Sequence, residues 1–291
     1  MIIDSHAHAW PFWPYDPPVP DATSRGCVEQ LLWEMDRAGV DRAVLVSARI
    51  DHNPDNNDYV ADAVRAHPDR LDQFVDVDCR WMPEYHTPGA ADRLARAADR
   101  YRPAGITHYL KPENDGWLTS DEGMAFFAEA EARGLIASIA GPPVWQADLR
   151  TVARAHPRLV ILCHHLAGIP SYTSDRRAGL EMVLASADVP NIFIKVSGFY
   201  YGSAAPFDYP HPGAIAVFKT LYDAFGAERL AWGSDYPVAP MRAYTYRQSL
   251  ELVRRHCPFV APQDMALILG QTLGALLGHC PAPVSALQGS A

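Results

Sequence analysis

Short apolar segments alternate along this chain with longer segments of helical periodicity. Eight of the apolar segments carry few polar residues on either face, which is typical of strands buried on both sides in a parallel sheet. We expect them at residues 2–8, 42–48, 71–78, 105–111, 135–141, 159–165, 191–198 and 229–235. Each strand is followed by a segment that predicts a helix.

The expected helices span residues 26–38, 56–66, 89–101, 120–133, 146–155, 175–187, 211–225 and 242–256, with a further helix at 263–277. Local chemistry marks several boundaries. Ser120 is a good N-cap, and Gly134 is a good helix stop. Pro68 and Pro157 end two other helices, because the residue before a proline disfavours the helical conformation.

Eight strand–helix units in a row predict an α/β fold, a (β/α)8 TIM barrel. We expect a single domain over residues 1–280 with one extra C-terminal helix, and a loose tail over 281–291. A doubly wound open sheet is the alternative, but it would normally carry a glycine-rich phosphate loop after its first strand. Here that place holds a proline- and tryptophan-rich loop at 10–20.

Composition narrows the function classes. The 291 residues are 48% hydrophobic and carry a net charge of −9, which argues against nucleic-acid binding. No apolar run is long enough for a membrane span, and no secretory leader is visible at the start. The five cysteines are scattered and form no C-x-x-C pair. We therefore expect a cytoplasmic protein with reduced thiols that acts on a small molecule, with a homo-oligomer left open.

The most informative motif is Asp4-Ser5-His6-Ala7-His8, at the end of the first strand. Side chains at i and i+2 of a strand point to the same side, so the two imidazoles share a direction. The last strand ends in Gly233-Ser234-Asp235. Because the active site of a TIM barrel lies at the carboxyl ends of its strands, we expect His6, His8 and Asp235 to meet.

Other polar side chains follow the remaining strands. Arginine and lysine there suit an anionic substrate, and aromatic side chains suit a ring. The predicted substrate-binding residues are Arg49, Arg80, Lys111, Lys195, Tyr200 and Trp10. His164 and His165 are neighbours on one strand, so we expect at most one of them to face the barrel axis.

The ordered motifs resemble the amidohydrolase superfamily. They are D-x-H-x-H at 4–8, LCHHLAG at 162–168, KVSG at 195–198 and WGSDYP at 232–237. Within the superfamily, the chain looks like the branch of sugar-lactone and pyrone-dicarboxylate lactonases, which neighbours the aminocarboxymuconate-semialdehyde and resorcylate decarboxylases. The resemblance spans roughly residues 1–278.

The resemblance implies catalytic roles for four residues. Asp235 matches the aspartate that takes a proton from the attacking water, and His6 and His8 match the first-strand pair. His165 matches the strand-six histidine, because it precedes the Leu-Ala-Gly that follows this histidine in relatives. His164 stands where many relatives carry Asp.

The resemblance leaves the metal open. Zinc-dependent relatives place a histidine at the end of strand five, and residues 136–141 hold none. His6, His8 and Asp235 remain as ligands for one divalent ion, zinc or manganese, which is enough for a catalytic site. Pyrone-dicarboxylate lactonases share the gap and work without metal. A binuclear site bridged by a carboxylated Lys111 is a further alternative that the missing histidine also disfavours.

The leading hypothesis is therefore hydrolysis of a lactone or related cyclic ester of a small carboxylated or sugar-derived substrate. Asp235 activates water, and the histidines or a metal polarise the carbonyl. The alternative is a metal-dependent decarboxylase of an aromatic or muconate-type acid. A non-catalytic binding barrel is the third possibility, which the retained histidines and Asp235 disfavour.

Overall fold

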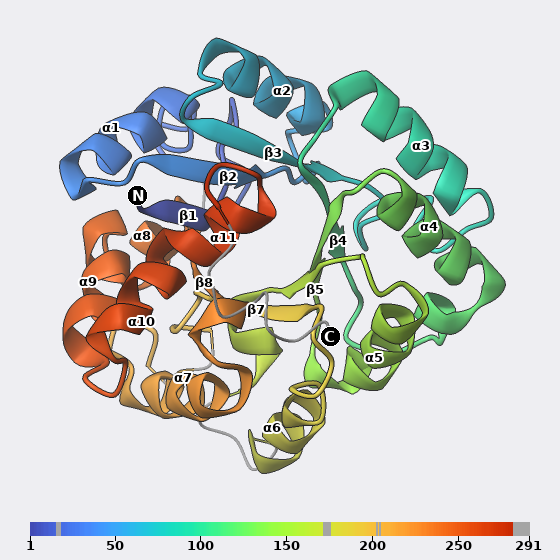
Figure 1. Cartoon of the computed structure of the whole chain (residues 1–291). Helices are drawn as coiled ribbons and strands as arrows, with labels where there is room; N and C mark the ends of the chain where they lie inside the picture. The colour runs from blue at the N-terminus through green and yellow to red at the C-terminus, as the bar shows by residue number, and fades with distance from the viewer. Residues whose placement is uncertain (16–18, 171–175, 202, 204, 282–291) are drawn as a thin grey trace.

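The computed structural model describes residues 1–15, 19–170, 176–201, 203 and 205–281. Eight parallel strands follow one another around a single sheet in the order of the sequence, as predicted (Figure 1). They are Ile3–Ala7 (β1), Arg42–Val46 (β2), Leu71–Asp76 (β3), Gly105–Tyr109 (β4), Ile136–Ala140 (β5), Ile161–Cys163 (β6), Ile192–Val196 (β7) and Leu230–Trp232 (β8).

The sheet closes between its last and first strands. Ala7 forms a parallel bridge with Tyr236. The backbone amide of His8 donates to the carbonyl of Tyr236 at 2.7 Å, and the amide of Asp235 donates to the carbonyl of His6 at 2.8 Å. The closure confirms the (β/α)8 barrel and brings the two terminal motifs of the sequence side by side.

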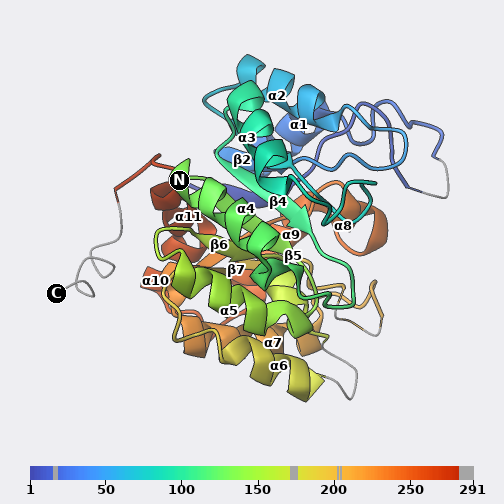
Figure 2. The same ribbon diagram turned by 90° about the vertical axis from the view of Figure 1, so that its right-hand side faces the viewer.

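Helices surround the barrel, most of them on its outside and a few at its two ends (Figures 1 and 2). They are Val28–Ala38 (α1), Asn56–Ala66 (α2), Ala90–Tyr101 (α3), Asp121–Ala132 (α4), Gln146–Ala155 (α5), Arg176–Leu184 (α6), Pro212–Phe225 (α7), Val238–Arg242 (α8), Tyr246–His256 (α9), Pro262–Ala266 (α10) and Thr272–Leu276 (α11). Within the described residues, no helix has the length and apolarity that a membrane crossing requires.

Capping chemistry explains where the predicted helix boundaries hold and where they do not. The Ser120 hydroxyl accepts from the amide of Gly123 at the start of α4. The helix expected at 242–256 begins later, because Thr245 and Gln248 form a capping box. The extra helix expected at 263–277 is interrupted at Gly270, where a Cβ atom would lie 2.5 Å from the carbonyl oxygen of Met1. The predicted tail lies outside the described residues apart from Pro281.

The two ends of the barrel differ in character. Figure 2 shows α10 and α11 beside the N-terminus at one end and α8 at the other. An apolar cluster that includes Ile3, Val44, Phe74, Leu162 and Leu273 fills the interior on the α11 side. The buried polar side chains that end the strands therefore gather at the opposite end, where α8 lies.

Candidate active site

A cavity of about 810 Å³ opens at the carboxyl ends of the strands. His8, His164, His165 and Asp235 line it, together with aromatic and arginine side chains from several loops. The cavity therefore contains residues from β1, β6 and β8 that are far apart in the sequence, as the barrel topology requires.

His6, His8 and Asp235 meet as predicted. Nε2 of His6 lies 3.1 Å from Nε2 of His8 and 3.5 Å from Oδ1 of Asp235. Nε2 of His8 lies 3.7 Å from the same oxygen. The other nitrogen of His8, Nδ1, donates to the carbonyl of Val46 at 2.7 Å, so Nε2 of His8 carries a lone pair into the site.

The two carboxylate oxygens of Asp235 differ, because one accepts a hydrogen bond and the other does not. The Tyr200 hydroxyl donates to Oδ2 at 2.5 Å, whereas Oδ1 is buried without a hydrogen-bond partner. Burial raises the pKa of Asp235 to about 7, and hydrogen bonds from Tyr200 and Tyr201 oppose that rise. Oδ1 is thus a basic oxygen with nothing to satisfy it except a ligand or water.

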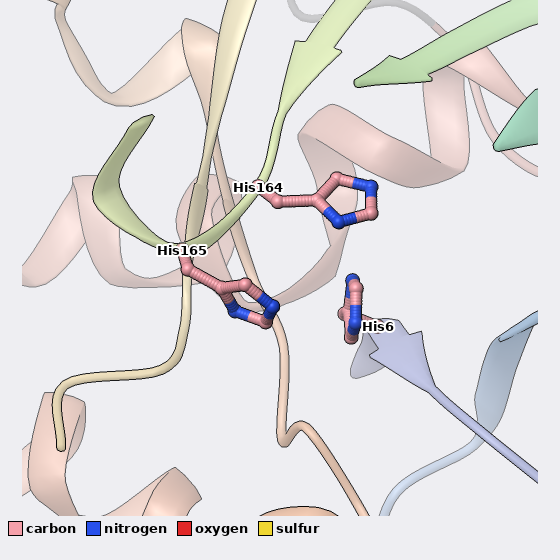
Figure 3. A group of neighbouring side chains, drawn as sticks. All are labelled: His6, His164 and His165. Atoms are coloured by element: carbon pink, nitrogen blue, oxygen red, sulfur yellow. The ribbon is translucent and has the colours of Figure 1, made fainter. Parts of the chain in front are cut away.

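Both histidines that follow β6 face the site, contrary to the prediction that at most one would. The rings of His164 and His165 are both directed towards His6, with ring centroids 4.5 Å from it in each case (Figure 3). The strand ends at Cys163, and the residues from His165 to Ala167 have φ values of 46–55°. In this left-handed turn the alternation of strand side chains no longer applies.

Gly198 makes room for His165. Its φ is +62°, and a Cβ atom there would lie 2.6 Å from Nδ1 of His165. That nitrogen lies 3.0 Å from the hydroxyl oxygen of Ser197.

We expect Gly198→Ala to lower kcat by roughly 100-fold, the scale of losing one aligned donor, because the added methyl group displaces the His165 ring. The measurement is steady-state kinetics on a lactone that the substrate panel proposed below identifies, with thermal unfolding to show that the barrel is intact. Gly278→Ala is the matched control: Gly278 also has a positive φ of 74°, and nothing lies within 4 Å of its Cβ position. Equal effects of the two substitutions would contradict the steric reason.

A buried polar layer lies beneath these rings. Nζ of Lys195 donates to the Ser138 hydroxyl at 2.7 Å and lies 3.1 Å from Nδ1 of His6. The Ser138 hydroxyl oxygen lies 2.5 Å from Nε2 of His164. Lys195 is fully buried and forms no ion pair with a described carboxylate. Its place in the fold makes it a support for His6 and Ser138.

Burial governs the protonation of the cluster. It lowers the pKa of His6, His164 and His165 well below the usual value, and a protonated Lys195 lowers the pKa of each ring further. The pKa of His8 falls to about 4, again mainly through burial. All four rings are therefore neutral at pH 7, and each presents one N–H and one lone pair.

The site fits a divalent metal ion. Ligand atoms about 2.1 Å from a tetrahedral zinc lie roughly 3.4 Å from one another. The separations of 3.1, 3.5 and 3.7 Å among His6, His8 and Asp235 Oδ1 agree with this. His8 already has the required tautomer. A bound ion also requires the proton of His6 on Nδ1, where an uncharged Lys195 amine accepts it, and burial lowers the pKa of Lys195 towards that form.

The predicted substrate-binding residues divide into two groups. Arg49 and Arg80 lie in the cavity wall. The other four do not line the cavity. Lys195 is buried beneath the site, and Tyr200 lies behind Asp235, to which its hydroxyl donates. Trp10 is stacked on His8, and the exposed Lys111 lies over the Tyr85 ring with Nζ 4.8 Å from the ring centroid. Trp10 is fully buried, and its Nε1 donates to the carbonyl of Ala48, so it holds the plane of His8.

Several lining residues did not emerge as site candidates from the sequence. They are Tyr15, Trp81, Tyr109 and Arg242. Tyr109 follows from strand parity, because β4 directs Tyr109 inwards and His108 outwards against Trp117 and Phe126. Arg242 ends α8, and no strand pattern marks it.

Comparison with known proteins identifies the family. The amidohydrolase family model matches residues 3–278, from β1 to the end of the described barrel. The chain belongs to the amidohydrolase family. Its resemblance to this superfamily, first visible in the strand-end motifs, is thereby confirmed, and the protein is an enzyme of the amidohydrolase superfamily.

Individual relatives agree with this placement. The chain is 28% identical over 283 residues to an L-fucono-1,5-lactonase of Burkholderia ambifaria, covering 92% of both chains. Among solved structures, a probable 2-pyrone-4,6-dicarboxylic acid hydrolase of Acinetobacter baumannii with citric acid bound has a TM-score of 0.75 at 20% identity, covering 95% of this chain and 99% of that one. A zinc-bound amidohydrolase of Burkholderia multivorans has a TM-score of 0.74 at 19% identity, with coverage of 96% and 99%.

Proposed function

We propose that this enzyme hydrolyses a lactone or related cyclic ester, with Asp235 as the base that activates water. The observation that carries the proposal is the free Oδ1 of Asp235, buried and within 3.7 Å of two imidazoles at the floor of the cavity. The likeness to an L-fucono-1,5-lactonase over nearly the whole chain supports this reaction class.

The reaction follows from the positions of the groups. Oδ1 of Asp235 accepts a proton from water, and the hydroxide adds to the lactone carbonyl carbon. The negative charge that forms on the carbonyl oxygen meets N–H donors of the imidazoles beside it, His165 among them. Collapse of the adduct breaks the ring C–O bond, and Asp235 returns its proton to the leaving alkoxide. The Tyr200 hydrogen bond keeps Oδ2 fixed, so Oδ1 performs both transfers.

His6, His8 and Asp235 are the residues that would hold a divalent ion. Such an ion, when bound, polarises the carbonyl as a Lewis acid. The protein orients the ligand side chains through hydrogen bonds: the Val46 carbonyl holds Nδ1 of His8, and Nζ of Lys195 holds Nδ1 of His6.

The substrate is proposed to carry a carboxylate. Arg49, Arg80 and Arg242 line the cavity, and within the described part of the chain none of them forms an ion pair. Arg93, by contrast, makes a two-point ion pair with Asp78. Arginines without an acidic partner at the wall of a cavity suit an anion, which a guanidinium group binds by two parallel hydrogen bonds. A structural relative was solved with citric acid, a polycarboxylate, bound, and this supports an anionic substrate.

Replacing Arg80 or Arg242 with alanine is expected to raise KM for a carboxylated lactone by about 10- to 100-fold, the scale of losing a charge-assisted hydrogen bond. KM for an uncharged sugar lactone should stay within about twofold. Arg65→Ala on α2, exposed and paired with Asp62, is the matched control. If both kinds of lactone lose affinity equally, the arginines do not bind a substrate carboxylate.

The test of the proposed function is a panel of sugar lactones and pyrone carboxylates, followed by acid release with a pH indicator. Each assay is run as purified, after chelation, and with zinc or manganese added. We expect turnover of at least one lactone. Carbon dioxide release from hydroxybenzoates without lactone turnover would instead support the decarboxylase.

We further propose that the enzyme works in the cytoplasm on a small molecule and does not bind nucleic acid. All five cysteines are free, which suits a reducing compartment, and the net charge is −9. A homo-oligomer remains a proposal that light scattering on the purified chain tests directly.

A further inference from the structure

His164 has a pocket-facing nitrogen with no role in the reaction described so far. The residue lines the cavity and is buried, and its Nδ1 has no hydrogen-bond partner. Tyr109 packs edge-on against the ring on one side, with centroids 5.2 Å apart, and His6 lies on another. Figure 3 shows the ring directed into the group that His6 and His165 complete.

The hydrogen bonds behind the ring determine which nitrogen carries the proton. The Ser138 hydroxyl group can donate one hydrogen bond, and Nε2 of His164, 2.5 Å from its oxygen, is placed to accept it. The Ser138 oxygen already accepts from Nζ of Lys195 at 2.7 Å, a bond that a charged or an uncharged amine can donate. If His164 donated to Ser138 instead, the Ser138 proton would need the single lone pair of an uncharged Lys195 amine, and Nδ1–H of His6, 3.1 Å from Nζ, would lose its acceptor.

The satisfied arrangement therefore runs in one direction, from Lys195 to Ser138 to Nε2 of His164. Nε2 accepts, so the single proton of the neutral ring lies on Nδ1. Nδ1–H is then a buried donor at the cavity wall without a protein acceptor. An unsatisfied buried donor costs about 1–3 kcal/mol, which a ligand oxygen at this position recovers.

We propose that His164 is a catalytic residue that donates a hydrogen bond from Nδ1–H to the carbonyl oxygen of the substrate, and that Ser138 is its positioning residue. The proposal rests on the proposed lactone hydrolysis. His164 and His165 then supply adjacent donors to the oxygen that becomes negative, and the left-handed turn after β6 is what places both rings on the same side.

Two substitutions separate the proposed role from a structural one. An asparagine side chain places its amide nitrogen where Nδ1 of histidine lies, and a glutamine side chain reaches the position of Nε2. We expect His164→Asn to keep kcat within about 10-fold of the parent, and His164→Gln to lose roughly 100- to 1000-fold. KM should change little in either variant, because the donor acts on the developing charge.

Ser138→Ala provides an independent measurement. Without the hydroxyl donor, the His164 ring loses its fixed direction, and we expect kcat to fall by roughly 10-fold at unchanged KM. Thermal unfolding of all three variants shows that the barrel is folded. Equal losses in His164→Asn and His164→Gln, or an unchanged kcat in Ser138→Ala, would overturn the proposal. Failure of the parent enzyme to hydrolyse any lactone would instead overturn the proposed function.

Discussion

Asp235→Asn is expected to lower kcat for lactone hydrolysis by about 10²- to 10⁴-fold, the contribution of a positioned general base. The amide keeps the shape of the carboxyl group and still accepts the Tyr200 hydrogen bond, but it cannot take a proton from water. Steady-state kinetics measures the loss, and circular dichroism and thermal unfolding show that the fold is retained.

The control for this prediction is Asp62→Asn. Asp62 is an exposed carboxylate on α2 that does not line the cavity, and it pairs with Arg65. The Asp62→Asn variant should have wild-type kcat and KM. Wild-type activity in Asp235→Asn would remove Asp235 from the mechanism.

The second large effect is expected from Lys195→Met, which should lower kcat by roughly 100-fold without lowering the melting temperature. The substitution removes the group that orients His6 and Ser138. It also removes a fully buried amine that no described carboxylate pairs with, and burying such a group is costly. Methionine fills a similar volume next to Phe74, whose ring centroid lies 5.4 Å from Nζ of Lys195.

Lys219→Met is the matched control for Lys195→Met. Lys219 is exposed on α7 and pairs with Asp223 one helical turn away. We expect neither kcat nor the melting temperature to change appreciably there. A marked fall in the melting temperature of Lys195→Met with unchanged kcat would show that Lys195 serves stability rather than function.

The fold could be predicted from the sequence because the evidence for it is periodic. Strands that are apolar on both faces recur with helices between them, and the absence of a glycine-rich loop after the first strand favours a barrel over an open sheet. The spacing of His6 and His8 fixes their common direction, and the barrel order then brings Asp235 beside them. The placement of His6, His8 and Asp235 therefore follows from the two-residue period of strand side chains and from the closure of the sheet.

The rest of the site depends on features that period-two reasoning does not capture. The left-handed conformation from His165 to Ala167 turns two adjacent histidines to the same side. Arg242 lines the cavity from the end of α8, where no strand pattern marks it. The depth of Lys195 within the barrel, beneath His6, depends on packing between strands that are far apart in the sequence.

The most direct test of the central claim is a single turnover in water labelled with ¹⁸O, with enzyme in excess over a lactone that the panel identifies. Attack of Asp235-activated water on the carbonyl carbon predicts one ¹⁸O atom in the carboxyl group of the product and none in Asp235. An unlabelled first-turnover product with ¹⁸O in the Asp235 side chain would show that Asp235 attacks the carbonyl itself, and would contradict the mechanism.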